Sequence, residues 1–286
     1  MKLQTKQRKI ILLAFILFPL FLLSSCETNA PLSNINKNHL IIHYIDVGQG
    51  DSMLIQIHGK NMLIDAGTTE STNELVNYLK KQRIDKLDYV IETHPHEDHI
   101  GAMSKIINKF EINKFYGPKI TANTKAFENM VDSLKSKSLK INVAKAGQTI
   151  DLGSDIKCKI IAPNSDAYKE INNYSVVIKL EFGNTSFLFE GDAEKISETE
   201  MITKGYNLSC DVLKIGHHGS RTATSDEFLK ETHPKISIIS CGLNNDYGHP
   251  HKPTLTKLNA INSKIYRTNK DGTVILESDG IKISKK

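Results

Sequence analysis

The sequence has few cysteines and no Cys-x-x-Cys pair: four cysteines occur in 286 residues. Cys26 follows an N-terminal apolar run, which leaves Cys158, Cys210 and Cys241 in the rest of the chain. An odd number of cysteines without paired spacing does not indicate a disulfide framework, although one bridge among the three stays open. Cys158 and Cys210 lie in strand-like runs, so we expect them to be small buried hydrophobic residues.

A charge excess of one sign is also missing from most of the chain. The formal net charge is +5, but four of the 37 basic residues and none of the 32 acidic residues lie in residues 1–26. Residues 27–286 therefore hold 33 basic and 32 acidic residues, a net charge of +1. This balance lacks the overall basic excess that is typical of a nucleic-acid-binding protein. Attraction to a polyanionic substrate would have to be local or come from bound metal ions.

The chain contains a single long apolar run, residues 10–23, which Pro19 interrupts. Basic residues precede the run, and Leu23-Ser24-Ser25-Cys26 follows it. The run is shorter than the about 20 residues of a comfortable membrane-spanning helix, so it is typical of an export signal. The small residues before Cys26 resemble a lipoprotein signal, which implies that residues 1–26 direct export and that Cys26 is lipidated.

An uncleaved membrane anchor with an incidental cysteine is the alternative interpretation of this N-terminus. Both interpretations place the rest of the chain outside the cytoplasm and attach it to the cell membrane, which would be a partner through the lipid on Cys26. Residues 27–39 are polar and are expected to form a flexible tether. The folded domain is then expected to occupy residues 40–286.

Strand-like and helical patterns alternate in this domain, and no internal repeat is found. Strands are expected at residues 40–47, 52–57, 62–64, 87–91, 149–152, 156–161, 175–182, 186–189, 211–215 and 236–240, and helices at 70–82, 100–110, 194–203 and 254–260. Along the chain, a run of strands is followed by α/β units, and this order then occurs a second time. Such an order predicts a sandwich of two mixed sheets with helices outside. Each segment that carries His or Asp follows a strand, where a rigid sheet can hold a functional loop.

Four potential metal ligands lie within six residues: His94, His96, Asp98 and His99. Alternate spacing in an extended loop puts the first three on one side, and His99 turns toward them as a helix begins. Imidazole and carboxylate donors together suit zinc and tolerate manganese or iron. A polar surface loop is the alternative, but three histidines with an interleaved aspartate directly after an apolar strand favour a metal site.

The pattern His-x-His-x-Asp-His after a strand resembles the signature of the metallo-β-lactamase-like superfamily. Further matching segments are residues 46–51 (Asp-Val-Gly-Gln-Gly-Asp), 63–67, 189–192 and 214–220, the last of which contains Gly-His-His-Gly-Ser. This combination is similar to the extracellular domain of ComEC-type competence proteins and their stand-alone relatives, and a surface choline-phosphate esterase has a similar domain. The resemblance implies a four-layer αββα sandwich over residues 40–286 and the activity of a metallohydrolase.

Carried over by position, the resemblance implies a site for two divalent metal ions, with zinc expected first and manganese as the alternative. The implied ligands of the first metal are His94, His96 and Asp192, and those of the second metal are Asp98, His99, Asp192 and His217. Asp192 would bridge the two ions, together with a water or hydroxide. Asp65 would lie behind a ligand imidazole and orient it.

The sequence departs from the family pattern at one ligand. Family members that bind two zinc ions tightly place a third histidine on the first metal, whereas no histidine lies between His99 and His217 here. Residues 172–175 (Asn-Asn-Tyr-Ser) stand about where that ligand would be, and Asn173 is expected to support the ligands from behind. The first metal would keep three protein ligands, and such a weaker, oxygen-richer site is compatible with manganese.

Paired metal ions make bound water nucleophilic at neutral pH and suit cleavage of phosphodiesters or phosphomonoesters. Asp98 is expected to orient the nucleophile. His218 is a candidate proton donor to the substrate or leaving group, with a buried structural histidine as the equal alternative. For residues 248–251 (Gly-His-Pro-His), a place lining the site and an exposed loop both stay open.

Three functions are compatible with these residues. The first is an extracytoplasmic phosphoester hydrolase whose substrate is DNA or a phosphate-containing polymer of the cell surface. The second is a hydrolase of a lactam, a thioester or another non-phosphate ester, against which the missing third histidine counts. The third is a non-catalytic, metal-binding surface lipoprotein that assists DNA uptake, against which the six implied ligands count. The sequence indicates no protein partner.

Overall fold

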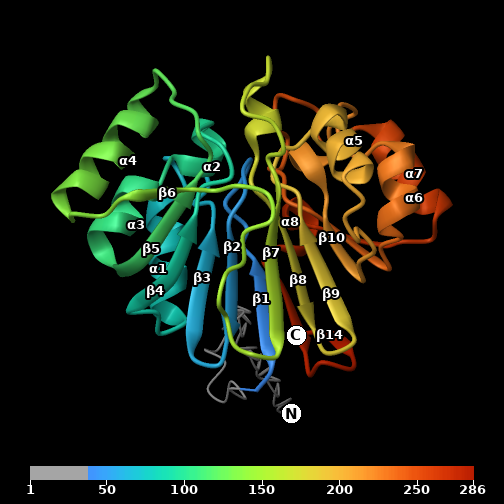
Figure 1. The fold of residues 1–286 in the computed structure, drawn as a ribbon, viewed down its shortest axis with the longest axis horizontal. Coiled ribbons are helices and arrows are strands. Elements are labelled where there is room, and N and C mark those ends of the chain that lie inside the picture. The colour runs from blue at the N-terminus through green and yellow to red at the C-terminus, as the bar shows by residue number, and fades with distance from the viewer. Residues whose placement is uncertain (1–37) are drawn as a thin grey trace, which may run out of the picture. The chain divides into compact units, whose positions relative to one another are not determined.

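The computed structural model describes residues 38–286, and two facing sheets form the middle of this part of the chain (Figure 1). The first sheet has the order β14-β13-β1-β2-β3-β4-β5-β6. Its strands are β1 (Leu40–Tyr44), β2 (Met53–Ile57), β3 (Lys60–Ile64), β4 (Lys86–Ile91), β5 (Glu111–Gly117), β6 (Ile141–Val143), β13 (Val274–Ser278) and β14 (Ile283–Lys285). Strands β13, β1, β2 and β3 pair antiparallel, and β3 to β6 pair parallel.

The second sheet has the order β12-β11-β10-β9-β8-β7 and repeats this division into antiparallel and parallel halves. Its strands are β7 (Ile156–Ala162), β8 (Val177–Phe182), β9 (Thr185–Phe189), β10 (Val212–Lys214), β11 (Ile236–Ile239) and β12 (Lys264–Arg267). Strands β7 to β9 pair antiparallel, whereas β9 to β12 pair parallel. Short helices connect the parallel strands, because a parallel crossover needs such a return.

Eight α-helices and two 3₁₀ helices occur among the described residues. They are α1 (Thr72–Lys81), α2 (Glu97–Ile100), α3 (Met103–Lys109), α4 (Lys125–Ser136), α5 (Lys195–Thr203), α6 (Asp226–Thr232), α7 (Lys252–Ala260), α8 (Thr268–Asp271), η1 (Ile171–Tyr174) and η2 (Gly216–Gly219). None of these helices is long and apolar enough to cross a membrane.

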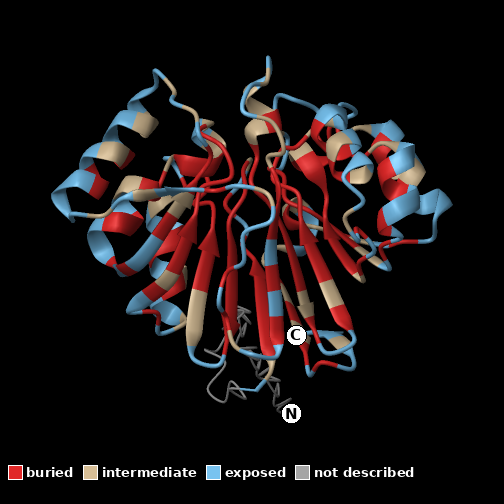
Figure 2. Ribbon diagram, in the orientation of Figure 1, coloured by how far each residue is buried: buried red, intermediate tan, exposed pale blue. Residues whose placement is uncertain are grey.

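Three separate hydrophobic cores show that the molecule has four layers. The middle core joins the two sheets, for example through Tyr44 of β1 and Phe189 of β9, whose rings stack 6.1 Å apart. A second core packs α1, α3 and α4 on the outer face of the first sheet. A third core packs α5, α6 and α7 on the outer face of the second sheet. Figure 2 shows the central strands of both sheets as mostly buried, with more exposed residues on outer strands such as β7. The predicted αββα sandwich is therefore confirmed.

The hairpin between β8 and β9 turns at Gly183-Asn184, as the sequence predicts. Gly183 has a φ of +55°, and a Cβ there would lie 2.3 Å from the carbonyl oxygen of Gly280. Two other expectations differ from the structure. Residues 149–152 form only an isolated bridge from Thr149 to Lys159 instead of a strand. The helix expected over residues 100–110 corresponds to α3, which begins at Met103, and the short α2 that carries Asp98 and His99 precedes it.

Cys158, Cys210 and Cys241 are buried and free, so no disulfide links them. Burial raises the pKa of the Cys158 thiol to about 12, which keeps it neutral. Cys26, the predicted lipidation site, and residues 1–37 lie outside the described residues. The predicted export signal and most of the predicted tether therefore stay predictions.

Candidate metal centre

The predicted ligands come from strand ends of both sheets, which meet at one edge of the sandwich. The loop after β4 carries His94 and His96, and α2 begins directly afterwards. The segment after β9 carries Asp192, and the segment after β10 leads into η2 with its two histidines. Since β4, β9 and β10 each belong to a parallel half of their sheet, their carboxyl ends place these loops together.

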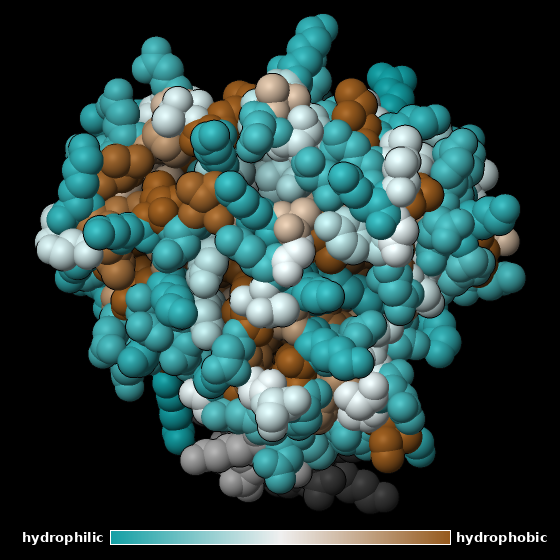
Figure 3. Space-filling model, viewed as in Figure 1, coloured by the Kyte–Doolittle hydropathy of each residue, from teal (hydrophilic) through white to brown (hydrophobic). Residues whose placement is uncertain are grey.

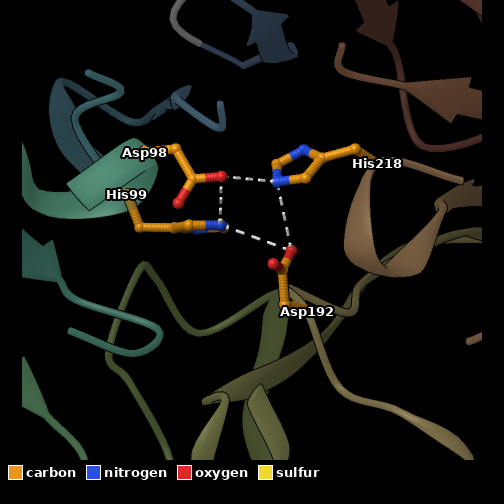
Figure 4. A group of neighbouring side chains, drawn as sticks. All are labelled: Asp98, His99, Asp192 and His218. Carbon is orange, nitrogen blue, oxygen red and sulfur yellow. Dashed lines mark hydrogen bonds and ion pairs between the residues drawn. The ribbon is translucent and has the colours of Figure 1, made fainter. Parts of the chain in front are cut away.

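One group of ligand atoms is formed by Asp98, His99, Asp192 and His218 (Figure 4). All four atoms lie within 4.8 Å of one another. Nε2 of His218 lies 3.1 Å from an oxygen of Asp98 and 3.5 Å from Oδ1 of Asp192. Nε2 of His99 lies 3.3 Å from the same Oδ1 atom. Two imidazoles and two carboxylates thus surround one point.

A second group is formed by His94, His96 and Asp192. Nε2 of His94 lies 3.7 Å from Oδ2 of Asp192 and 3.0 Å from Nδ1 of His96. Burial lowers the pKa of His94 well below its ordinary value, so its imidazole is neutral, as a metal ligand must be. Asp192 therefore offers Oδ1 to the group that contains His99 and His218, and Oδ2 to the group that contains His94, which is the geometry of a bridging carboxylate.

Two buried atoms of this centre have no hydrogen-bond partner among the described residues: Nε2 of His99 and Oδ1 of Asp192. Buried polar atoms are nearly always bonded, so unpartnered ones that face each other need a ligand that accepts lone pairs from both. Imidazole nitrogens and carboxylate oxygens suit zinc or manganese. The residues present therefore fit a site for two divalent cations.

Asp65, for which the resemblance implies a place behind a ligand imidazole, lies against His99 with a fully buried side chain. Its Oδ2 is 2.7 Å from Nδ1 of His99, and it accepts hydrogen bonds from the backbone N–H and the hydroxyl of Thr93. Thr93 fixes the carboxylate of Asp65 through two hydrogen bonds, and this carboxylate in turn fixes the imidazole of His99 at Nδ1. Nε2 of His99 therefore faces the cluster.

A second buried carboxylate, Asp51, stands behind His218 in the same way. Oδ1 of Asp51 lies 3.3 Å from Nδ1 of His218, which also lies 2.9 Å from the carbonyl oxygen of Ser240. Nζ of Lys214 lies 2.7 Å from Oδ2 of Asp51, and both side chains are fully buried. Burial alone would raise the pKa of Asp51, but the charge of Lys214 lowers it below its ordinary value.

No role was expected for Asp51 or Lys214 from the sequence, although both residues lie in segments that match the family. One signal was available: each is a charged residue at the edge of an apolar strand, and such residues are rarely buried without a partner. Gly50 makes the position of Asp51 feasible, since a Cβ at Gly50 would lie 2.3 Å from the carbonyl oxygen of Asp98.

The two neighbouring histidines of η2 occupy different places. The prediction gave the last ligand to His217 and a proton-donating role to His218. The structure brings His218, which is 1% exposed, into the ligand group and leaves the side chain of His217 24% exposed at the rim. Nε2 of His217 lies 3.8 Å from Asp192, and its Nδ1 lies 3.3 Å from Glu194. Both histidines have left-handed backbone angles, with φ of 46° and 53°, which turn their side chains in ways that strand alternation does not predict.

Asn173 is buried near the centre but does not lie against a ligand imidazole as expected. Its side-chain oxygen accepts hydrogen bonds from the backbone N–H groups of Glu194 and Ser197 at the start of α5. It therefore holds the segment that follows Asp192. Ser175 lies in the segment that stands in place of the third histidine. Its hydroxyl lies 3.4 Å from Nδ1 of His94 and accepts a hydrogen bond from the N–H of Asp192.

Comparison with known proteins agrees with this geometry. A family model described as the metallo-beta-lactamase superfamily matches residues 45–243. The chain belongs to this superfamily. It is 32% identical over 251 residues to the ComE operon protein 3 of Bacillus subtilis, covering 82% of this chain and 32% of that protein. It is 29% identical over 254 residues to the Recombination protein 2 of Haemophilus influenzae, covering 87% and 30%. The chain spans about a third of the length of these relatives, and the ComEC-type resemblance is confirmed.

Solved structures show the same superfamily fold. The metallo-beta-lactamase fold protein YhfI of Bacillus subtilis superposes with a TM-score of 0.56 at 12% identity, covering 84% of this chain and 99% of that one. Igni18, a metallo hydrolase of Ignicoccus hospitalis, superposes with a TM-score of 0.53 at 19% identity, covering 82% and 98%. At these identities the likeness shows the fold alone.

Of residues 248–251, His249 lies beside the two histidines of η2, whereas Gly248 is exposed. The ring of His249 lies 5.4 Å from that of His217 and 6.0 Å from that of His218, and His249 is 8% exposed. Asn245 holds the loop by accepting from the N–H of His249 and donating to its carbonyl oxygen. Tyr247 stacks on His249 and is 66% exposed.

Proposed function

We propose that this chain hydrolyses phosphoester bonds outside the cytoplasm with two divalent metal ions. The observation that carries the proposal is the bridging geometry of Asp192, whose two oxygens face two separate groups of nitrogen and oxygen ligands. Two bound cations would lower the pKa of a water between them and neutralise charge on the phosphoryl oxygens. Zinc is expected first, with manganese as the alternative.

The chain's own residues would hold the reacting groups in place. The side chain of Asp98 is 27% exposed, and one of its oxygens lies 3.1 Å from Nε2 of His218. Asp98 can therefore contact a water molecule in the centre and orient it. His218 is enclosed among the ligand atoms, which favours a ligand role over proton donation. His217 lies at the rim with Glu194 behind its Nδ1, and it is the better candidate to protonate a leaving group.

The ligand group of His94, His96 and Asp192 favours phosphoesters over lactams. No third histidine joins this group among the described residues: the hydroxyl of Ser175 lies 3.4 Å from Nδ1 of His94, and Nδ2 of Asn172 lies 3.4 Å from Nδ1 of His217. Fewer nitrogen donors make a harder, oxygen-richer site, and such sites suit the oxygen atoms of phosphate. The relative named Recombination protein 2 is compatible with DNA as the substrate, and a phosphate-containing surface polymer has the same scissile bond.

The deciding experiment is hydrolysis of bis-p-nitrophenyl phosphate by the purified protein after loading with zinc or manganese. We expect turnover with one of the two ions and little hydrolysis of a chromogenic cephalosporin. Full metal occupancy without phosphodiester turnover in either ion would contradict the proposal. It would instead support the alternative of a metal-binding surface protein without catalysis.

Replacing His217 with asparagine tests the proton donor. An alkoxide needs a proton in order to leave, whereas p-nitrophenolate does not. We therefore expect kcat to fall about 10²-fold for an alkyl phosphodiester and less than about threefold for the p-nitrophenyl ester. Equal losses on both substrates, or loss of bound metal by elemental analysis, would instead assign His217 to the ligands.

Attachment to the membrane is proposed from residues 1–26 alone. Replacing Cys26 with serine should move the protein from the membrane fraction to the soluble extracytoplasmic fraction and abolish palmitate labelling, because one or more acyl chains supply the anchor. Unchanged fractionation of the variant would favour the uncleaved-anchor interpretation.

A further inference from the structure

Positive charge is concentrated in one part of the domain. Residues 101–150, called the basic lobe below, contain nine lysines and three acidic residues, a net charge of +6. Residues 38–100 contain five basic and ten acidic residues, and residues 151–286 contain eighteen of each. The near-zero net charge of the domain therefore conceals a strongly basic segment. Such local excess creates an attractive field for anions even when the total charge is small.

The nine lysines of the basic lobe are all exposed. Two of them form surface ion pairs within α4: Lys125 with Glu128 and Lys135 with Asp132. The other seven make no ion pair with any of residues 38–286; they are Lys105, Lys109, Lys114, Lys119, Lys137, Lys140 and Lys145. Exposed ammonium groups without a carboxylate partner keep their charge available to an external anion.

Lysines from different elements converge in this lobe. Lys109 at the end of α3 and Lys137 just after α4 line one cavity of about 380 Å³. Lys119 after β5 and Lys145 after β6 line a second, smaller one together with Tyr174. Tyr174 ends η1, whose Asn172 contacts His217 at the rim of the metal centre.

The basic lobe also adjoins the metal centre through α2, which carries Asp98 and His99 and packs against α4. Figure 1 shows α3, α4 and β6 on one side of the strand ends that form the centre. The positive surface thus begins beside the rim and extends away from it.

The extent of this surface fits a polymer. Lys125 is the first residue of α4 and Lys137 follows its last. At 1.5 Å per residue they are about 18 Å apart along the helix axis. Duplex DNA carries one charge per about 1.7 Å, so about ten phosphates would lie along this length. A single phosphate group could contact only a small part of it.

A lipid surface fits the basic lobe less well than DNA does. Surfaces that lie on a membrane insert large apolar side chains. Val143, 37% exposed, is the one exposed large hydrophobic residue of the lobe. Figure 3 shows apolar side chains on this side of the molecule, but Phe127, Val131 and Ile141 are partly buried and pack on the core below α4.

We propose that the basic lobe is a docking surface for DNA, which leads the polymer toward the metal centre. This inference rests on the proposed phosphoester hydrolase function and names DNA as the polymer whose bonds are cleaved. Binding requires only the lysines, so it can be measured on metal-free protein. It can therefore fail while hydrolysis of a small phosphodiester succeeds, and the reverse holds as well.

The test is binding of a labelled DNA duplex of about 30 base pairs to the full chain in EDTA, followed by fluorescence anisotropy across a range of salt. The variant carries Lys109→Gln, Lys119→Gln, Lys137→Gln and Lys145→Gln. The matched control carries the same change at four exposed lysines outside the lobe: Lys159, Lys204, Lys230 and Lys282. Thermal melting of both variants checks that they remain folded.

We expect the lobe variant to bind the duplex more than about tenfold more weakly at low salt and to lower the salt slope of log K by about 3 to 4. The control variant should change the slope by less than about 1. Equal loss in both variants would overturn the proposal, because it would reflect net charge alone. So would absence of DNA binding by the unaltered chain, or lysine-dependent binding to phosphatidylglycerol vesicles in place of DNA.

Discussion

Asp192→Asn should reduce phosphodiester turnover by about 10³-fold or more and lower the metal content from two ions per chain to one or fewer. Asp192 offers one oxygen to each ligand group, so removing its negative charge weakens both sites together. Charge stabilisation by bound metals contributes several kcal/mol to the reaction, and each 1.4 kcal/mol is a factor of ten. Turnover of bis-p-nitrophenyl phosphate and elemental analysis of dialysed protein measure the two effects.

Asp246→Asn is the matched control for Asp192→Asn. Asp246 is exposed on the loop that leads to His249, so its replacement makes the same change of charge near the centre without touching a ligand. We expect its turnover and metal content to stay within about twofold of the unaltered protein, as for most surface substitutions. An Asp192→Asn protein that retained two metals and near-full turnover would remove the bridging role.

Lys214→Met should destabilise the fold by about 3 to 5 kcal/mol, because it leaves the carboxylate of Asp51 buried without its cation. Both side chains are fully buried and lie 2.7 Å apart at their charged ends. Urea unfolding of the metal-free protein measures the change in the free energy of unfolding. Metal binding would weaken as well, since Asp51 stands behind His218.

The double variant Lys214→Met with Asp51→Asn distinguishes charge from packing. Removing both charges leaves a neutral pair, so part of the lost stability should return. Lys230→Met on the exposed surface of α6 is the control and should change stability by less than about 0.5 kcal/mol. A loss below about 1 kcal/mol for Lys214→Met alone would mean that Asp51 finds its compensation elsewhere.

The fold was predictable from the sequence because its signals are local. Apolar runs such as β4, Leu-Asp-Tyr-Val-Ile, are bounded by polar loops, and their order along the chain requires two mixed sheets with helices outside. The four ligands between His94 and His99 are recognisable for the same reason, since they are close in sequence as well as in space. Boundaries were less predictable: α3 begins three residues later than expected, and the short α2 that precedes it was not expected as a helix.

The second half of the centre depended on tertiary structure. Sequence spacing could not distinguish His217 from His218, because the answer depends on left-handed backbone angles at both residues. Asn173 was expected behind a ligand but instead caps the segment that leads into α5. The role of Asp51 is equally non-local, since its partners Lys214 and His218 come from the other sheet.

By itself the sequence determined the superfamily, the αββα sandwich, and the identity of most residues that could hold metal ions. These follow from periodicity and from motifs that are short segments of the chain. Only the tertiary structure decided which side chains face one another: the two oxygens of Asp192 toward two ligand groups, the buried support of His218, and the pairs of lysines that line common cavities. Such facts depend on how strand ends from two sheets meet, and packing between distant segments sets that geometry.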